Sequence, residues 1–188
     1  MKLNFKRLAL QLAHKWTIAR GSGTNTSPVV VVELTGADGT IGLGEAAPIK
    51  RYKESIETVE AFFKKIDPRG LSFADVEGSM EYLETVSPDD MSAKCALNIA
   101  LLDGAAKRVK KPIYDFLELG FRDNHHLTSF TIGIDTPDVI RKKVLEAEKY
   151  PVLKVKLGVA DDKANIQALR EVAPVKRVRV DANEGWKT

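Results

Sequence analysis

Two lysines and a downstream acidic segment are the residues whose types and spacing could do chemistry. Lys154 and Lys156 alternate with apolar residues. Because side chains alternate across a strand, both ammonium groups are expected on one face. Asp181 and Asn183 follow the same alternation in the run 177–183. Neighbouring cations favour the neutral lysine that can accept a proton, and carboxylate oxygens are ligands that Mg²⁺ prefers. The set could therefore move a proton beside a bound cation.

An edge strand with solvated lysines is the alternative explanation for this pair. A strand buried in a parallel sheet is expected to be apolar on both faces, and departures from such rules tend to occur at functional sites. The neighbouring runs 127–132 and 177–183 also carry one polar and one apolar face. Three strands with matching polar faces favour a functional site over a solvated edge.

The strands that would position these residues alternate with helices. We expect strands at 127–134, 152–157 and 177–182, with helices after Thr136 and at 161–173. This alternation predicts βαβ units and a parallel sheet. Parallel sheets need cover on both faces, so three strands and two helices suggest a piece of something larger. The third strand would be an exposed edge, and we expect self-association as a homo-oligomer or partial disorder after residue 124.

The first part of the chain has a different pattern. It predicts an antiparallel sheet of about three strands, a loop at 16–27, and then helices. The expected strands lie at 2–12, 29–34 and 40–45, with a change of phase near Arg7, and the helices at about 56–66, 72–83 and 92–109. The change in pattern near residues 120–126 predicts two domains, 1–123 and 124–188.

Composition excludes several classes of function. The net charge is +3, from 29 basic and 26 acidic side chains. The two signs are interspersed along the chain and form no basic cluster, which argues against a nucleic-acid partner. Neither a signal-peptide core nor a bilayer-spanning stretch is visible, so no membrane partner is expected. The single cysteine, Cys95, rules out an intrachain disulfide. A cytoplasmic location is the default expectation.

The segment Lys154-Val155-Lys156, followed by Val180-Asp181-Ala182-Asn183-Glu184-Gly185-Trp186, resembles the muconate lactonizing enzyme subgroup of the enolase superfamily. The run 93–103 resembles the long helix of that family's capping domain. The run 127–132 resembles the first barrel strand of its dipeptide epimerases. The resemblance covers essentially the whole chain. It implies an α+β capping domain followed by the first three strands of a (β/α) TIM-type barrel, truncated there.

The resemblance also implies roles for individual residues. Lys156 would be the acid/base on one face of the substrate α-carbon, and Lys154 would stabilise the negative charge of the enolate intermediate. Asp181 would be the first of three Mg²⁺ ligands. Substrate-binding roles are implied for Arg20, Thr131 and Asn183. For Arg20, which could pair with a substrate carboxylate, an exposed loop arginine without a ligand is the alternative.

The activity implied is a Mg²⁺-dependent isomerase that epimerises dipeptides such as L-Ala-D/L-Glu. The other metal carboxylates and the opposing lysine of this family lie on later strands, so the chain alone is expected to be inactive. A lyase or cycloisomerase, such as o-succinylbenzoate synthase or muconate cycloisomerase, could use the same residues. A non-catalytic module that needs a complementary chain is a third hypothesis, from another class.

Overall fold

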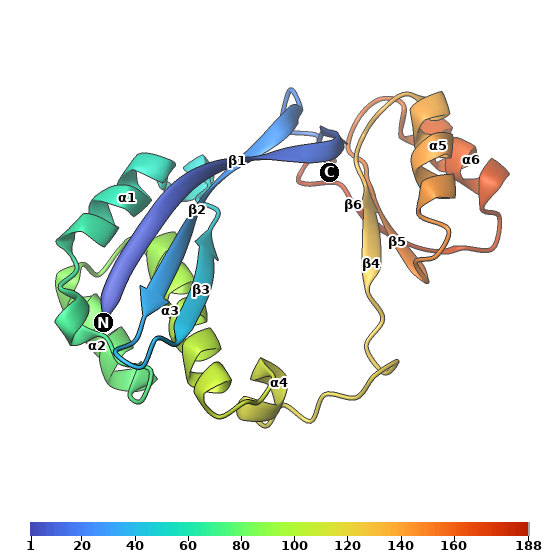
Figure 1. Cartoon of the computed structure of the whole chain (residues 1–188). Coiled ribbons are helices and arrows are strands. Elements are labelled where there is room, and N and C mark those ends of the chain that lie inside the picture. Colours follow the sequence, from blue (N-terminus) through green and yellow to red (C-terminus); the bar gives the residue numbers. More distant parts are fainter. Residues whose placement is uncertain (188) are drawn as a thin grey trace. The chain divides into compact units, whose positions relative to one another are not determined.

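The chain folds into two compact units. The structure is a computed structural model that describes residues 1–187. The first unit contains Met1–Leu10 and Thr26–Phe121, and the second contains Gln11–Asn25 and the chain from Arg122 onward. The segment 11–25 thus groups with the later part of the sequence, although it lies within the first stretch of strands (Figure 1).

The first unit is built on the predicted antiparallel sheet. The strands are β1 (Lys2–Trp16), β2 (Thr24–Thr35) and β3 (Ile41–Ala46), in the order β1-β2-β3. The end of β1 after Leu10 and the start of β2 before Thr26 belong to the second unit. β2 pairs antiparallel with β3, in a register that sets Val32 opposite Gly44. Along β1 the half-buried positions change from odd to even numbers around Lys6 and Arg7, which is the predicted change of phase.

Helices follow the sheet in the first unit. They are η1 (Lys50–Tyr52), α1 (Ile56–Lys65), η2 (Pro68–Gly70), α2 (Val76–Val86), α3 (Met91–Arg108) and α4 (Ile113–Phe116). α1 and α3 lie close to their predicted bounds. α2 begins later than expected from Ser72, because Asp75 is its N-cap and accepts a hydrogen bond of 2.9 Å from the amide of Gly78.

Close packing of α3 against β3 forms the centre of the first unit. A Cβ atom on Gly44 would overlap the carbonyl oxygen of Ala96, and one on Gly42 would overlap that of Ala100. Strand and helix backbones therefore touch at these two glycines. Around them lie the larger buried side chains of the core, which include Val30, Val32, Leu34, Phe62, Phe63, Leu83, Leu97 and Leu101.

A buried ammonium group lies beside this core. Lys94 on α3 is 1% exposed, and its Nζ lies 2.7 Å from Oε2 of Glu84 on α2. The Glu84 side chain itself is 56% exposed. The ion pair therefore has one desolvated partner and one that water can reach.

Removing only the Glu84 carboxylate should lower the stability of the first unit more than removing both partners of the ion pair. We expect Glu84→Gln to lower the free energy of unfolding of the first unit by about 1–2 kcal/mol, less than for a fully buried pair because Glu84 is largely exposed. Lys94→Met should be near neutral, and the double variant should match Lys94→Met. Hydrogen exchange of the α3 amides measures the change. Equal losses for all three variants would contradict this account.

The second unit carries the predicted parallel sheet. Its elements are β4 (Ser129–Ile132), α5 (Pro137–Glu146), β5 (Val152–Lys156), α6 (Asp162–Val172) and β6 (Arg177–Asp181). The strand order is β4-β5-β6, and both pairings are parallel. α5 and α6 lie against one face of the sheet (Figure 1). The core between them contains Ile132, Ile140, Val144, Leu153, Val155, Ala168 and Leu169.

One apolar residue departs from the predicted pattern. Val180 was expected to pack under the helices with Val178, but it is 50% exposed. β6 is an edge strand of the sheet, and among residues 1–187 only Val178 of this strand packs against the helix-covered core. The alternation of side chains along β6 was therefore predicted correctly, but the burial of Val180 was not.

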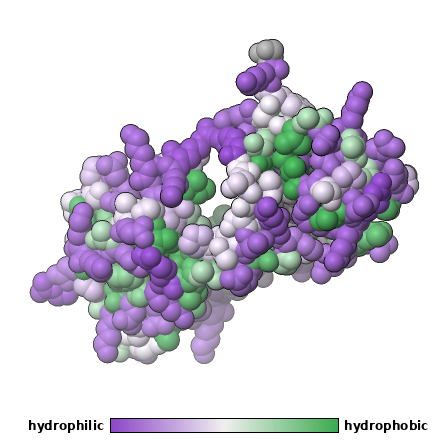
Figure 2. Space-filling view, turned by 90° about the horizontal axis from the view of Figure 1, so that it is seen from above, coloured by the Kyte–Doolittle hydropathy of each residue, from purple (hydrophilic) through white to green (hydrophobic). Residues whose placement is uncertain are grey.

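The surface is mainly hydrophilic on the face that Figure 2 shows, with hydrophobic residues in smaller groups. Within residues 1–187 no helix combines the length and the apolar character that crossing a bilayer would require.

Candidate active site

The register of the parallel sheet brings the two predicted lysines to one aspartate. Lys156 lies directly beside Asp181 on the neighbouring strand, and Lys154 lies beside Arg179. Because Lys154 and Lys156 are two residues apart, both point to the face opposite the helices, as does Asp181. The strand pattern alone therefore places these three charged groups on the same sheet face as Arg179, with Lys156 and Asp181 at the carboxyl ends of β5 and β6.

Both ammonium groups contact a single carboxylate oxygen. The Nζ of Lys156 lies 2.8 Å from Oδ2 of Asp181, and the Nζ of Lys154 lies 2.9 Å from the same atom. The Lys156 side chain is 8% exposed, whereas that of Lys154 is 39% exposed. Lys156 is thus the better shielded of the two from water.

The carboxyl group of Asp181 is held in its ionised form. Hydrogen bonds from Lys156 and then Lys154 hold its pKa well below the usual range, and the backbone amide of Asn183 adds a bond of 2.9 Å to Oδ1. Asn183 has a left-handed backbone with φ of 46°. Its side-chain Oδ1 is buried, and no hydrogen-bond donor of the described chain reaches it. Such an atom is suited to a ligand.

A segment from the N-terminal part of the sequence covers Lys156. The Trp16 ring centroid lies 5.8 Å from the Nζ of Lys156, within range of a cation–π interaction. The next residue, Thr17, accepts a hydrogen bond of 3.1 Å from the amide of Ile134, just beyond β4. Trp16 thus lies beside the candidate base.

Arg20 lies in the loop between β1 and β2, at the same site. Its Nη1 atom lies 3.1 Å from Oε2 of Glu184, in the turn after β6. Both residues line a cavity of about 770 Å³, together with Ser129, Lys154, Arg179, Val180, Asp181, Ala182, Asn183 and Trp186. Thr131 sits beside Lys154 in the register but does not line this cavity. Glu184 as a partner for Arg20 was not predicted.

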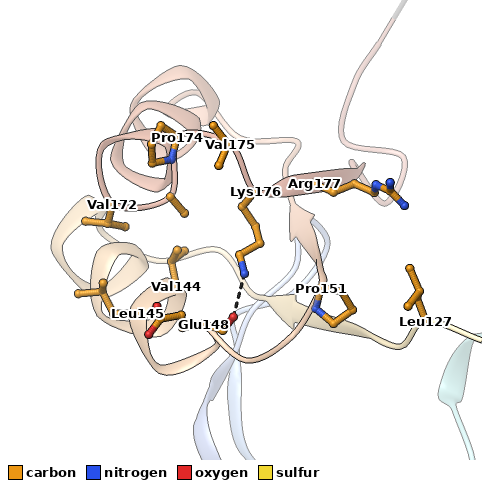
Figure 3. Close-up of a pocket in the computed structure, with 11 residues that line it drawn as sticks. Leu127, Val144, Leu145, Glu148, Pro151, Val172, Pro174, Val175, Lys176 and Arg177 are labelled. Atoms are coloured by element: carbon orange, nitrogen blue, oxygen red, sulfur yellow. Dashed lines mark hydrogen bonds between the residues drawn. The ribbon is translucent and has the colours of Figure 1, made fainter. Parts of the chain in front are cut away.

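A second hollow lies at the opposite end of the strands. It has a volume of about 620 Å³ and is lined mostly by apolar residues near the amino ends of β5 and β6 (Figure 3). Among the described residues that line it, the one carboxylate residue is Glu148, whose backbone carbonyl accepts a hydrogen bond of 2.8 Å from Lys176. Ligands of parallel α/β sheets bind at the carboxyl ends of the strands. The first cavity is therefore the candidate active site.

The site offers part of a magnesium-binding set. Asp181 supplies a carboxylate and Asn183 a buried amide oxygen, and both are oxygen donors of the kind that Mg²⁺ prefers. Among residues 1–187, no three His, Cys, Asp or Glu side chains gather as a metal site. The residues present thus fit one side of a magnesium site.

Known proteins resemble this chain over its full length. It is 60% identical to the L-Ala-D/L-amino acid epimerase of Pedosphaera parvula, over 100% of this chain and 55% of that protein. The substrate-liganded L-Ala-D/L-Glu epimerase of Bacillus subtilis superposes with a TM-score of 0.86 at 29% identity, over 100% of this chain and 54% of the other.

A dipeptide epimerase from Cytophaga hutchinsonii, in complex with Mg and D-Ala-L-Val, superposes with a TM-score of 0.83 at 28% identity, over 98% of this chain and 52% of that one. The chain thus spans about half the length of the relatives that it matches. These likenesses confirm the expected fold class, a capping domain followed by the first strands of a barrel. Residues 7–118, more than half of the chain, match the model for the N-terminal domain of mandelate racemase / muconate lactonizing enzyme. The chain belongs to this family.

Proposed function

We propose that this chain supplies the first part of a Mg²⁺-dependent epimerase, which inverts the α-carbon next to the carboxylate of a dipeptide such as L-Ala-D/L-Glu. The observation that supports it most is the convergence of Lys154 and Lys156 on Asp181 at the carboxyl edge of parallel strands. The 60% identity to an epimerase of L-Ala-D/L-amino acid dipeptides supports the same class of reaction.

Lys156 is the proposed acid/base. An α-proton next to a carboxylate is very weakly acidic, so its removal needs both a positioned base and nearby positive charge. Lys156 is well shielded, and Trp16 lies over its ammonium group. Lys154 is more exposed and lines the cavity, where its ammonium group would stabilise negative charge on the substrate carboxylate.

Asp181 is the proposed magnesium ligand of this chain. Bound Mg²⁺ would supply concentrated positive charge next to the substrate carboxylate. Asp181 would hold the cation through its carboxylate, which also accepts the hydrogen bonds of Lys154 and Lys156. Asn183 offers its buried oxygen either to the cation or to the substrate.

Arg20 and Thr131 are the proposed contacts for the rest of the dipeptide. Arg20 lines the cavity on a loop next to the site, and its guanidinium suits a carboxylate such as the side chain of a substrate glutamate. In this structure the Glu184 carboxylate occupies that position. An acidic substrate would therefore have to share Arg20 with Glu184 or displace it. Thr131, next to Lys154 in the sheet, would offer a hydroxyl.

Fusion to a relative tests the proposal. The chain alone should not exchange the α-proton of Ala-Glu, because among residues 1–187 no three His, Cys, Asp or Glu side chains gather as a metal site around Asp181 and its two lysines. A fusion of this chain to the remaining part of the Pedosphaera protein should epimerise Ala-Glu and lose that activity with EDTA. Proton NMR in D₂O follows both reactions. Robust turnover by the chain alone, or an inactive but folded fusion, would contradict the proposal.

A further inference from the structure

Asp162 makes more hydrogen bonds than the start of a helix requires. It is the first residue of α6, and its two carboxylate oxygens accept bonds of 3.0 and 2.9 Å from the amide of Gly158. The amide of Val159 donates another of 3.0 Å. The Nε1 of Trp186, 24 residues later, donates a fourth bond of 2.8 Å to Oδ2.

The loop contacts alone would be ordinary helix capping. Acidic residues in the first turn often bind nearby amides and favour the helix dipole. The bond from Trp186 has no such explanation, because this residue lies beyond β6 and takes no part in α6. Asp162 therefore joins two segments, the loop after β5 and the turn after β6. Burial alone would raise the pKa of Asp162, but bonds from Trp186, Val159 and Gly158 outweigh it and lower the pKa.

The two joined segments touch through their backbones. A Cβ atom on Gly158 would lie 2.5 Å from the carbonyl oxygen of Ala182, and one on Gly185 would lie 2.6 Å from that of Gly158. A bond of 3.0 Å from the amide of Leu157 to the carbonyl oxygen of Asp181 continues this contact along the strands. Without side chains between the segments, a small shift of one would move the other.

The turn that is held in this way determines how Asp181 is oriented. Asn183 and Glu184 both have left-handed backbones, with φ of 46° and 65°. Asparagine adopts this conformation readily, but it is strained for Glu184, which keeps it only where surrounding contacts restrain the turn. The amide of Asn183 binds Oδ1 of Asp181, so the conformation of the turn sets the direction of that carboxylate. Outer partners of this kind commonly orient a ligand side chain.

We propose that Asp162 is a positioning residue, which joins the loop after β5 to the turn after β6 and so holds Asp181 and Asn183 in place at the site. The proposal rests on the proposed function only in taking Asp181 and Asn183 as functional groups. The proposal gives Asp162 a role at the site, although the Asp162 side chain does not line the cavity.

Asp162→Asn tests this role by NMR of the chain itself. The indole proton of Trp186 should shift while that of Trp16 stays. Exchange of the Asn183 and Gly185 amides should rise at least about tenfold, since a hydrogen bond to a charged acceptor is lost. The Lys156 ammonium signal should also change, because its partner Asp181 moves. Asp161→Asn is the matched control: Asp161 is exposed and makes no side-chain capping bond.

A second variant keeps the test decisive if Asp162→Asn fails to fold. Trp186→Phe removes the indole donor but keeps the bonds to the Gly158 and Val159 amides. It should raise the exchange of the Asn183 and Gly185 amides more than that of those loop amides, which keep their bonds to Asp162. Unaltered exchange of Asn183 and Gly185 in the folded variants would overturn the proposal and leave Asp162 as a local cap. Because these measurements do not depend on enzymatic activity, an inactive fusion protein would contradict the proposed function but not the role of Asp162.

Discussion

Replacing Lys156 with Met in the fused protein is expected to lower the turnover of epimerisation roughly 10²–10⁴-fold. Methionine keeps the length and much of the volume of the side chain but cannot carry a proton. Epimerisation needs proton transfer on both faces of the α-carbon, and Lys156 would serve one. The variant should therefore still exchange the α-proton of one epimer in D₂O, through a base on the opposite face. Proton NMR with each separate epimer measures both effects.

The control for this variant is another lysine of the same unit. Lys163 is exposed on α6, away from the residues that line the cavity, and Lys163→Met should keep full turnover. Lys154→Met should reduce turnover as well, but without the difference between epimers, since Lys154 is proposed to stabilise charge rather than to move the proton. A Lys156→Met protein that still interconverts the two epimers would refute the role of Lys156 as base.

Gly44→Ala is expected to have the largest effect on stability. The added Cβ would overlap the backbone carbonyl oxygen of Ala96, and no side-chain rotation can relieve a contact with backbone. β3 and α3 would have to separate, although their backbones touch at Gly42 and Gly44. We expect a loss of at least about 3 kcal/mol in the free energy of unfolding of this unit. Hydrogen exchange of the α3 amides in increasing urea measures it.

Gly39→Ala separates steric overlap from backbone strain. Gly39 has φ of +80°, yet a Cβ there would meet no atom within 4 Å. The expected cost is only that of a left-handed alanine, about 1–2 kcal/mol. A similar cost for the two alanine variants would show that β3 and α3 can move apart easily, against the packing described above.

Much of the fold could be predicted because local patterns determine it. The alternation in 152–157 and 177–183 assigned the faces of both strands, and the parallel register then required Lys156 to meet Asp181. Burial was harder to predict, since it depends on what covers a strand. Val180 has the alternation of a core residue but lies on an edge strand, where it is half exposed.

The contacts that the sequence did not reveal are those between distant segments. Nothing near Glu184 in the sequence indicates that its carboxylate meets Arg20, and nothing near Asp162 points to Trp186. A buried indole N–H usually finds an acceptor, but Trp186 is 59% exposed, so this rule did not predict an acceptor for it. Which acceptor it finds depends on how the β5 and β6 ends lie together, and that is a property of the folded sheet.

The grouping of residues 11–25 with the second unit has a consequence for anyone who would divide the protein. The chain passes between its units at three points, at 10/11, 25/26 and 121/122. A single cut near residue 122 would leave the later fragment without Trp16 and Arg20. The earlier fragment would keep residues 11–25 without the unit with which they group. The side chains of the site thus come from both fragments. Shortening the gene at one end cannot give a fragment that holds the whole second unit without part of the first.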